Sequence, residues 1–137
     1  MADTIRALSA LQALFADNTS RAISEQDLRD GFQSAIGVFP TLAKTASYTL
    51  TDDDVFIPVD ATAGAVVLTL PAATSTRAGK FYIAFKADAG ANAVSFARAG
   101  ADTINSATSK ATTTQWTILF IIRASSSTWA CGALTVV

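Results

Sequence analysis

The chain has 137 residues, which is enough for one ordinary domain with an appendage but too few for two independent hydrophobic cores. Its 10 basic residues nearly balance its 11 acidic ones without forming a basic run, so the positive surface typical of nucleic-acid-binding proteins is missing. No stretch approaches the roughly 18 consecutive apolar residues of a membrane-spanning helix. We therefore expect neither nucleic acid nor a membrane as a partner.

The first 37 residues carry helical spacing. Apolar residues recur at three- and four-residue steps between Asp3 and Ala16, and Ser24 is a good N-cap for a second helix that ends at Gly37. We expect residues 1–37 to form two short helices that act as an attachment or assembly segment. Their stripe either packs on the rest of the chain or, as we favour, is left for a neighbouring subunit. The stripe residues are Ile5, Leu8, Leu11, Phe15, Leu28 and Phe32.

The pattern changes after Pro40, where Thr, Val, Ile and aromatic residues occur in short runs divided by Gly, Asp, Asn and Pro. We place a linker at residues 38–46 and a β-domain at 47–137. The chain is therefore predicted to be mainly β, with two helices before a small β-sandwich or jelly-roll-like domain of about eight strands. The expected strands are Ser47–Leu50, Val55–Val59, Ala65–Leu70, Lys80–Ala87, Ala93–Ala97, Ser109–Thr112, Gln115–Arg123 and Thr128–Val136.

Two of these strands have informative patterns. In residues 80–86 the aromatic and aliphatic side chains Phe81, Ile83 and Phe85 alternate with Lys, Tyr and Ala, so one of the two faces is expected to line the core. Residues 116–122 are almost continuously apolar, so both faces should be covered, one by the core and one by another sheet or another subunit. The expected interface residues of the β-domain are Trp116, Ile118, Phe120 and Ile122.

Few residues have the character of catalytic or metal-binding groups. The chain has no His, which excludes the usual general base of Ser-His and Cys-His sites and the commonest zinc ligand. We expect no enzyme, no metal and no cofactor. Asp52–Asp54 is favoured as a turn over a calcium site. The single Cys131 excludes an intrachain disulfide, fits a protein made in a reducing cytosol, and is more typical of a small buried residue than of a reactive thiol.

Aromatic residues leave one further alternative open. Trp116 and Trp129 could stack on a sugar, although their positions in strands favour core or interface packing. The candidate glycan contacts are Trp129 and Tyr82.

Three segments resemble parts of bacteriophage virion proteins. The run LFADNTSRAISEQDLRD at residues 14–30 resembles an opening segment of phage tail-fibre and other virion-surface proteins. The segments VVLTLPAA at 66–73 and AGADTIN at 99–105, with Trp129 near the end, resemble a small β-module of phage fibres, spikes and capsid surface proteins. In that module, a TLPA turn and a G-x-D-T-I-N turn join the strands.

This resemblance implies a homotrimer in the virion, made in the host cytoplasm, whose helical segment serves attachment. Its partners would be further copies of itself and the major capsid protein or other virion proteins. A single β-module without a repeat array or shaft favours a non-enzymatic capsid decoration (cement) or head-fibre protein. The alternatives are a tail-fibre or baseplate attachment component and, from a different class, a carbohydrate-binding β-module.

Overall fold

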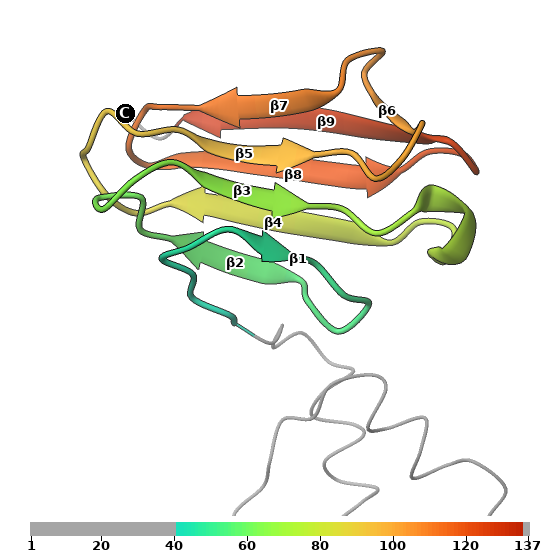
Figure 1. Ribbon diagram of the computed structural model, residues 1–137, viewed down its shortest axis with the longest axis horizontal. Helices are drawn as coiled ribbons and strands as arrows, with labels where there is room; N and C mark the ends of the chain where they lie inside the picture. Colours follow the sequence, from blue (N-terminus) through green and yellow to red (C-terminus); the bar gives the residue numbers. More distant parts are fainter. Residues whose placement is uncertain (1–40, 136–137) are drawn as a thin grey trace, which may run out of the picture. The chain divides into compact units, whose positions relative to one another are not determined.

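The computed structural model describes residues 41–135 (Figure 1). The chain divides into two units after Pro40, and the described residues belong to the second. The two predicted helices and their stripe from Ile5 to Phe32 lie outside the described residues. The division after Pro40 falls within the predicted linker at 38–46, and Thr41 and Lys44 form parallel bridges with Phe56 and Val59. The β-unit therefore begins at Thr41.

The described chain is a β-structure of nine strands and one short 3-10 helix. All eight predicted runs contain a strand. The structure adds one strand that was not predicted, β6, inside the G-x-D-T-I-N segment. With two residues, β6 is too short to produce a periodic pattern. The elements are β1 (Tyr48–Thr49), β2 (Phe56–Val59), β3 (Val66–Thr69), η1 (Ala73–Ser75), β4 (Phe81–Lys86), β5 (Val94–Ala97), β6 (Thr103–Ile104), β7 (Ser109–Thr112), β8 (Thr117–Arg123) and β9 (Thr128–Thr135).

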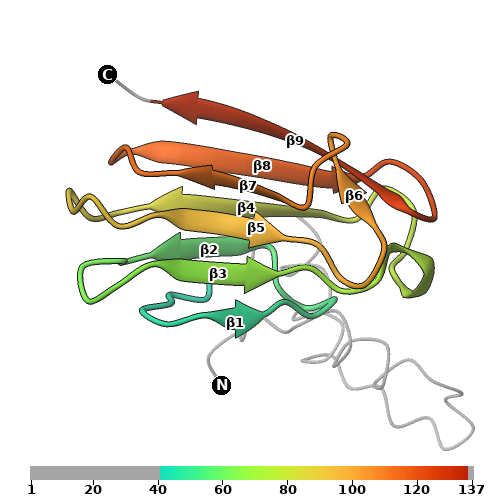
Figure 2. The same ribbon diagram turned by 45° about the horizontal axis from the view of Figure 1, so that its top comes forward.

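The strands form two sheets that lie one over the other (Figures 1 and 2). The four-stranded sheet has the order β1-β3-β5-β7, and the five-stranded sheet has the order β2-β4-β8-β9-β6. From β1 to β8, each strand belongs to the sheet opposite that of the strand before it, so β1, β3 and β5 are parallel neighbours, as are β2 and β4. The predicted sandwich is confirmed, but a jelly roll is wrong for its first half, because jelly rolls are built from antiparallel strands.

The core lies between the two inner faces. In the four-stranded sheet, Leu68 pairs with Tyr48 on one side and Phe96 on the other, so the inward side chains stack in a column. In the five-stranded sheet, Tyr82 and Trp129 are both fully buried, with ring centroids 5.8 Å apart. Aromatic pairs in this geometry add about 1 kcal/mol to the burial of their area.

The inner face of β4 also carries a buried charge. Lys86 is completely buried, and its Nζ lies 2.7 Å from Oδ1 of Asp88. Asp88 accepts further hydrogen bonds from the backbone N–H groups of Ala61 and Gly90. The hydrogen bond from Lys86, followed by that from Ala61, lowers the pKa of Asp88 from 3.8 to about 2. This pairing lets a lysine occupy a core position.

The TLPA and G-x-D-T-I-N turn segments contact each other. The Oδ2 of Asp102, in the G-x-D-T-I-N segment, accepts a 2.7 Å hydrogen bond from the N–H of Ala73, which follows the TLPA residues and begins η1. Arg98 donates to the carbonyl of Asp102 at 3.0 Å. Gly100 adopts a φ of 49°, in a region that favours glycine, and Ile104 is fully buried. The two motifs together hold one end of the sandwich.

The Asp52–Asp54 segment forms the predicted turn. Oδ2 of Asp54 accepts hydrogen bonds from the N–H and hydroxyl of Thr51, and Nζ of Lys80 donates to the carbonyls of Asp52 and Asp54 at 2.6 and 2.7 Å. Within residues 41–135, no cluster of His, Cys, Asp and Glu side chains has a geometry that could hold a metal. The same residues include no helix of the length and apolar character needed to cross a membrane.

Candidate interaction surface

The outer side of the five-stranded sheet is apolar across four strands, and we call it the aromatic face. Side chains alternate along a strand, so the residues between the buried positions of β2, β4, β8 and β9 point outward. Trp116 precedes β8 and joins the face through its ring contact with Phe85. The large side chains of the aromatic face are Phe56, Pro58, Phe81, Ile83, Phe85, Trp116, Ile118, Phe120, Ile122 and Leu134.

Strand register brings these side chains together in rows. Ile83 lies between Phe56 and Phe120 in one row, and Phe85 lies between Pro58 and Ile118 in the next. The rings also contact each other along the strands, with centroids 6.4 Å apart for Phe56 and Phe85 and 5.6 Å apart for Phe85 and Trp116. The face is therefore a packed apolar layer and not a scatter of single side chains.

Three of its ten side chains are exposed to solvent, and the other seven are half-buried. The exposed fraction of the residue is 41% for Phe120, 48% for Trp116 and 64% for Leu134. Soluble monomers rarely expose a continuous apolar patch of this kind unless it is functional. All four residues predicted as the β-domain interface, Trp116, Ile118, Phe120 and Ile122, lie on the aromatic face.

Trp116 is held in a strained backbone conformation. Its φ of 62° lies in the left-handed region, which costs a residue with a bulky side chain about 1 kcal/mol or more. Two hydrogen bonds hold the segment in place: the Trp116 N–H donates to the carbonyl of Lys86 at 3.0 Å, and Nε2 of Gln115 donates to the carbonyl of Ala87 at 2.9 Å. The strain lets the ring lie beside Phe85 on the aromatic face.

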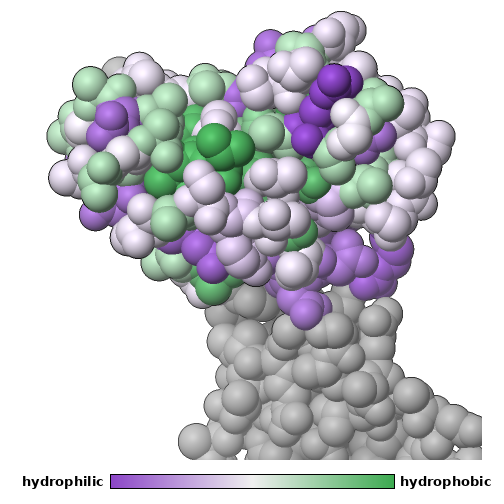
Figure 3. Space-filling view, in the orientation of Figure 1, coloured by the Kyte–Doolittle hydropathy of each residue, from purple (hydrophilic) through white to green (hydrophobic). Residues whose placement is uncertain are grey.

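The outer side of the four-stranded sheet has a different chemistry. Figure 3 shows this side, where pale colours of intermediate hydropathy predominate between a green area near the centre and separate purple patches. Val67, 36% exposed, is its one large hydrophobic residue among the described positions. The other outward residues are small or carry hydroxyl groups: Thr49, Thr69, Ser95, Ala97, Ser109 and Ala111.

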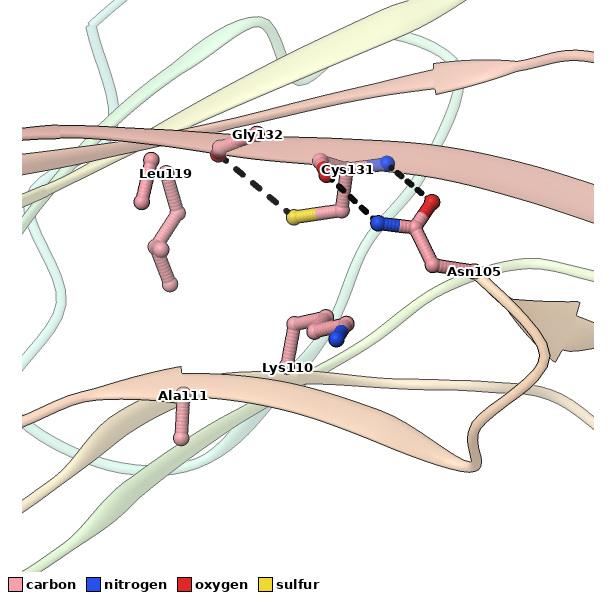
Figure 4. A pocket seen from close by; sticks show the side chains of 7 residues that line it. Asn105, Lys110, Ala111, Leu119, Cys131 and Gly132 are labelled. Atoms are coloured by element: carbon pink, nitrogen blue, oxygen red, sulfur yellow. Dashed lines mark hydrogen bonds between the residues drawn. The ribbon is translucent and has the colours of Figure 1, made fainter.

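A pocket of about 200 Å³ opens between the two sheets beside β9. Lys110 extends into it from β7, while Cys131 and Gly132 line the β9 side (Figure 4). Asn105 closes one end by accepting from the N–H of Cys131 and donating to its carbonyl. Partial burial raises the pKa of the Cys131 thiol, which lowers the fraction of reactive thiolate.

The predicted glycan contacts at Trp129 and Tyr82 are wrong. Both residues are fully buried in the core and cannot touch a ligand at the surface. The period-two pattern of their strands does not show which residues are buried, because either face of a half-buried strand can be the inner one. For the same reason, the outward positions of β2 and β4 were not predicted as interface residues. The alternation of Phe and Ile in residues 81–85 was visible in the sequence, but it does not say which of the two faces points outward.

Comparisons with known proteins do not assign a family. No family model matches the chain. The curated proteins likewise contain no match to it.

Proposed function

We propose that this protein is a non-enzymatic structural subunit of a bacteriophage virion, a homotrimeric capsid decoration or head-fibre protein that assembles through its aromatic face. The observation that carries the proposal is the continuous apolar layer over four strands of the five-stranded sheet. A surface of this kind is covered in the working state of a protein, and a further copy of the chain supplies a matching apolar surface.

Burial of this face would release free energy that favours assembly. A Phe side chain presents roughly 200 Å² of surface, so the 41% of Phe120 that is still exposed offers about 80 Å², worth about 2 kcal/mol when buried. Trp116 and Leu134 offer similar areas. These gains must exceed the loss of translational and rotational freedom on association, which requires several such side chains at each contact.

The turn motifs support the virion assignment. The TLPA and G-x-D-T-I-N segments resemble those of phage β-modules, and here they are in direct contact through Asp102 and Ala73. Because these motifs hold one end of the sandwich, their resemblance to phage β-modules supports a shared architecture. It gives no support for a shared reaction.

The non-enzymatic part of the proposal is supported by the chemistry of the pocket. Its one thiol, Cys131, has a raised pKa, and the side chain that holds its backbone is the neutral amide of Asn105. An activated nucleophile needs a lowered pKa or an adjacent base. Lys110 also lines the pocket and its charge lowers the pKa of the thiol, but burial has the larger effect, so the pKa is raised overall.

Native mass spectrometry of the full chain at micromolar concentration tests the assembly, and we expect a trimer. Phe120→Ser removes about 2 kcal/mol at each subunit contact and should give monomers. The matched control is Val67→Ser, which replaces a side chain of similar exposure on the opposite outer face and should leave the trimer intact. Circular dichroism must show both variants folded. A monomeric wild type, or a trimeric Phe120→Ser variant, would contradict the proposal.

Location on the particle is tested by immunogold labelling of intact phage with antibody against the β-domain. Gold particles on the head support a decoration or head-fibre protein. Gold particles at the tail or baseplate overturn the head assignment in favour of a tail-fibre or baseplate component.

A further inference from the structure

The outer edge of β9 is only partly paired. β6 runs parallel to β9 but pairs only with its first two residues, Thr128 and Trp129. Next along the edge, the side-chain amide of Asn105 takes the place of a strand and bonds both the N–H and the carbonyl of Cys131. Beyond Cys131, no strand of the described chain pairs with this edge.

The alternation of an antiparallel ladder fixes which backbone groups are free. The N–H and carbonyl of Cys131 point toward Asn105 and away from β8, so those of Ala133 and Thr135 point the same way. Among the described residues, no group accepts a hydrogen bond from the N–H of Ala133. Natural proteins protect such edges with Pro, charges or a covering segment. Residues 132–135 contain neither Pro nor charge.

The surroundings of this edge favour an extended segment with an acidic side chain. Gly132 and Ala133 are small enough to let another backbone approach closely, and the pocket of about 200 Å³ lies on the inner side of the edge. Lys110 lines that pocket from β7, and it forms no ion pair with any described residue. Figure 4 shows its side chain on the β9 side of its strand, whereas Ala111 points away.

We propose that the free edge of β9 binds an extended peptide segment of another protein chain, which adds a strand to the five-stranded sheet and directs an Asp or Glu side chain at Lys110. Backbone hydrogen bonds to Ala133 supply the pairing, and the lysine selects the side chain that enters the pocket. Residues on either side of the acidic one point outward, next to Leu134, and should be apolar. The site is the backbone edge of β9 and shares only Leu134 with the aromatic face, so peptide binding at this edge is measured separately from the trimer.

The test is an NMR titration of the ¹⁵N-labelled full chain with the peptide acetyl-Thr-Val-Asp-Val-Thr-amide. We expect the backbone amides of Ala133 and Thr135 to shift, with a dissociation constant in the millimolar range because the contact is short. The matched peptide with Asn in place of Asp should bind roughly threefold more weakly, as an exposed ion pair is worth less than about 1 kcal/mol. No shifts at these amides with about 5 mM peptide would overturn the proposal.

Two variants separate the backbone pairing from the charge. Lys110→Gln should bind the Asp and Asn peptides equally, and an unchanged preference for Asp would contradict the role of the lysine. Ala133→Pro removes one N–H donor at an edge position, where Pro is tolerated, and should abolish binding of both peptides. If Ala133→Pro instead dissociates oligomers of the free protein, the occupant of the edge is a second copy of this chain, and the acidic partner is wrong.

Discussion

The two outer faces of the sandwich belong to sheets that share one core, yet their chemistry is opposite. The five-stranded sheet presents aromatic and aliphatic side chains in packed rows, and the four-stranded sheet presents Thr, Ser and Ala around a single Val67. Folding requires only that the inner faces be apolar. The apolar layer on one outer face therefore serves something other than the fold, and the opposite face provides an internal control for it.

The largest expected effect on the free energy of unfolding comes from a substitution in the core, which leaves both outer faces unchanged. Asp88→Asn leaves the ammonium of Lys86 buried without a countercharge and should lower the free energy of unfolding by about 3 kcal/mol. Urea denaturation measures this change. The control Asp60→Asn alters an exposed carboxylate bonded to Thr62 and should leave the unfolding curve nearly unchanged. Equal effects of the two variants would mean that Lys86 needs no partner.

The same pair predicts how stability depends on pH. The pKa of Asp88 is lowered in the folded protein from 3.8 to about 2, so its ionised form stabilises the fold above about pH 4. This stabilisation is lost as the pH falls from 4 to 2. We expect the melting temperature of Asp88→Asn to fall less than that of the wild type over this interval. Parallel curves would contradict the role of the pair.

Trp116 tests the same comparison, because its backbone is strained while its ring lies on the aromatic face. Trp116→Gly and Trp116→Ala both remove the ring and should weaken trimerisation similarly. The free energy of unfolding of the Gly variant should be about 1 kcal/mol higher than that of the Ala variant, since glycine adopts a φ of 62° without steric cost. Chemical denaturation under monomeric conditions measures this difference. Equal stabilities would show that the backbone relaxes when the ring is removed.

The smallest effect is expected on the hydroxyl-rich face. Ser95→Val adds an apolar side chain beside Val67 and Ala111, its neighbours in the strand register. The free energy of unfolding should change by less than about 0.5 kcal/mol, and the oligomeric state measured by native mass spectrometry should not change. A new oligomer would show that one added side chain is enough to make this face associate.

The sequence predicted most strands well because most are short runs of β-branched and aromatic residues between turn formers. It could not predict which way β4 faces. Phe81, Ile83 and Phe85 are the more apolar set, yet the buried set is Tyr82, Ala84 and Lys86. The decision depends on Asp88, which neutralises Lys86, and on Trp129, which packs on Tyr82. Both are tertiary contacts that a local pattern does not contain.

The candidate surface was predicted in part. The nearly continuous apolar run of residues 116–122 indicated two covered faces, and the four predicted interface residues in this run do lie together on the aromatic face. The neighbouring outward residues of β2 and β4 were missed because their strand pairing was unknown. The free edge of β9 was also beyond prediction, since it depends on where β6 stops and on the amide of Asn105.

The alternation of successive strands between the two sheets has a consequence for how such a domain can change in length. Because β1, β3 and β5 stack in parallel with Tyr48, Leu68 and Phe96 in one column, each pair of strands is one turn of a coil. An inserted pair would extend each sheet by about 4.8 Å and need only repeat the same inward pattern. The antiparallel strands β7 and β8 then end the coil unchanged. A chain lengthened by one such pair would therefore keep the inward pattern of its core and gain one strand on each outer face.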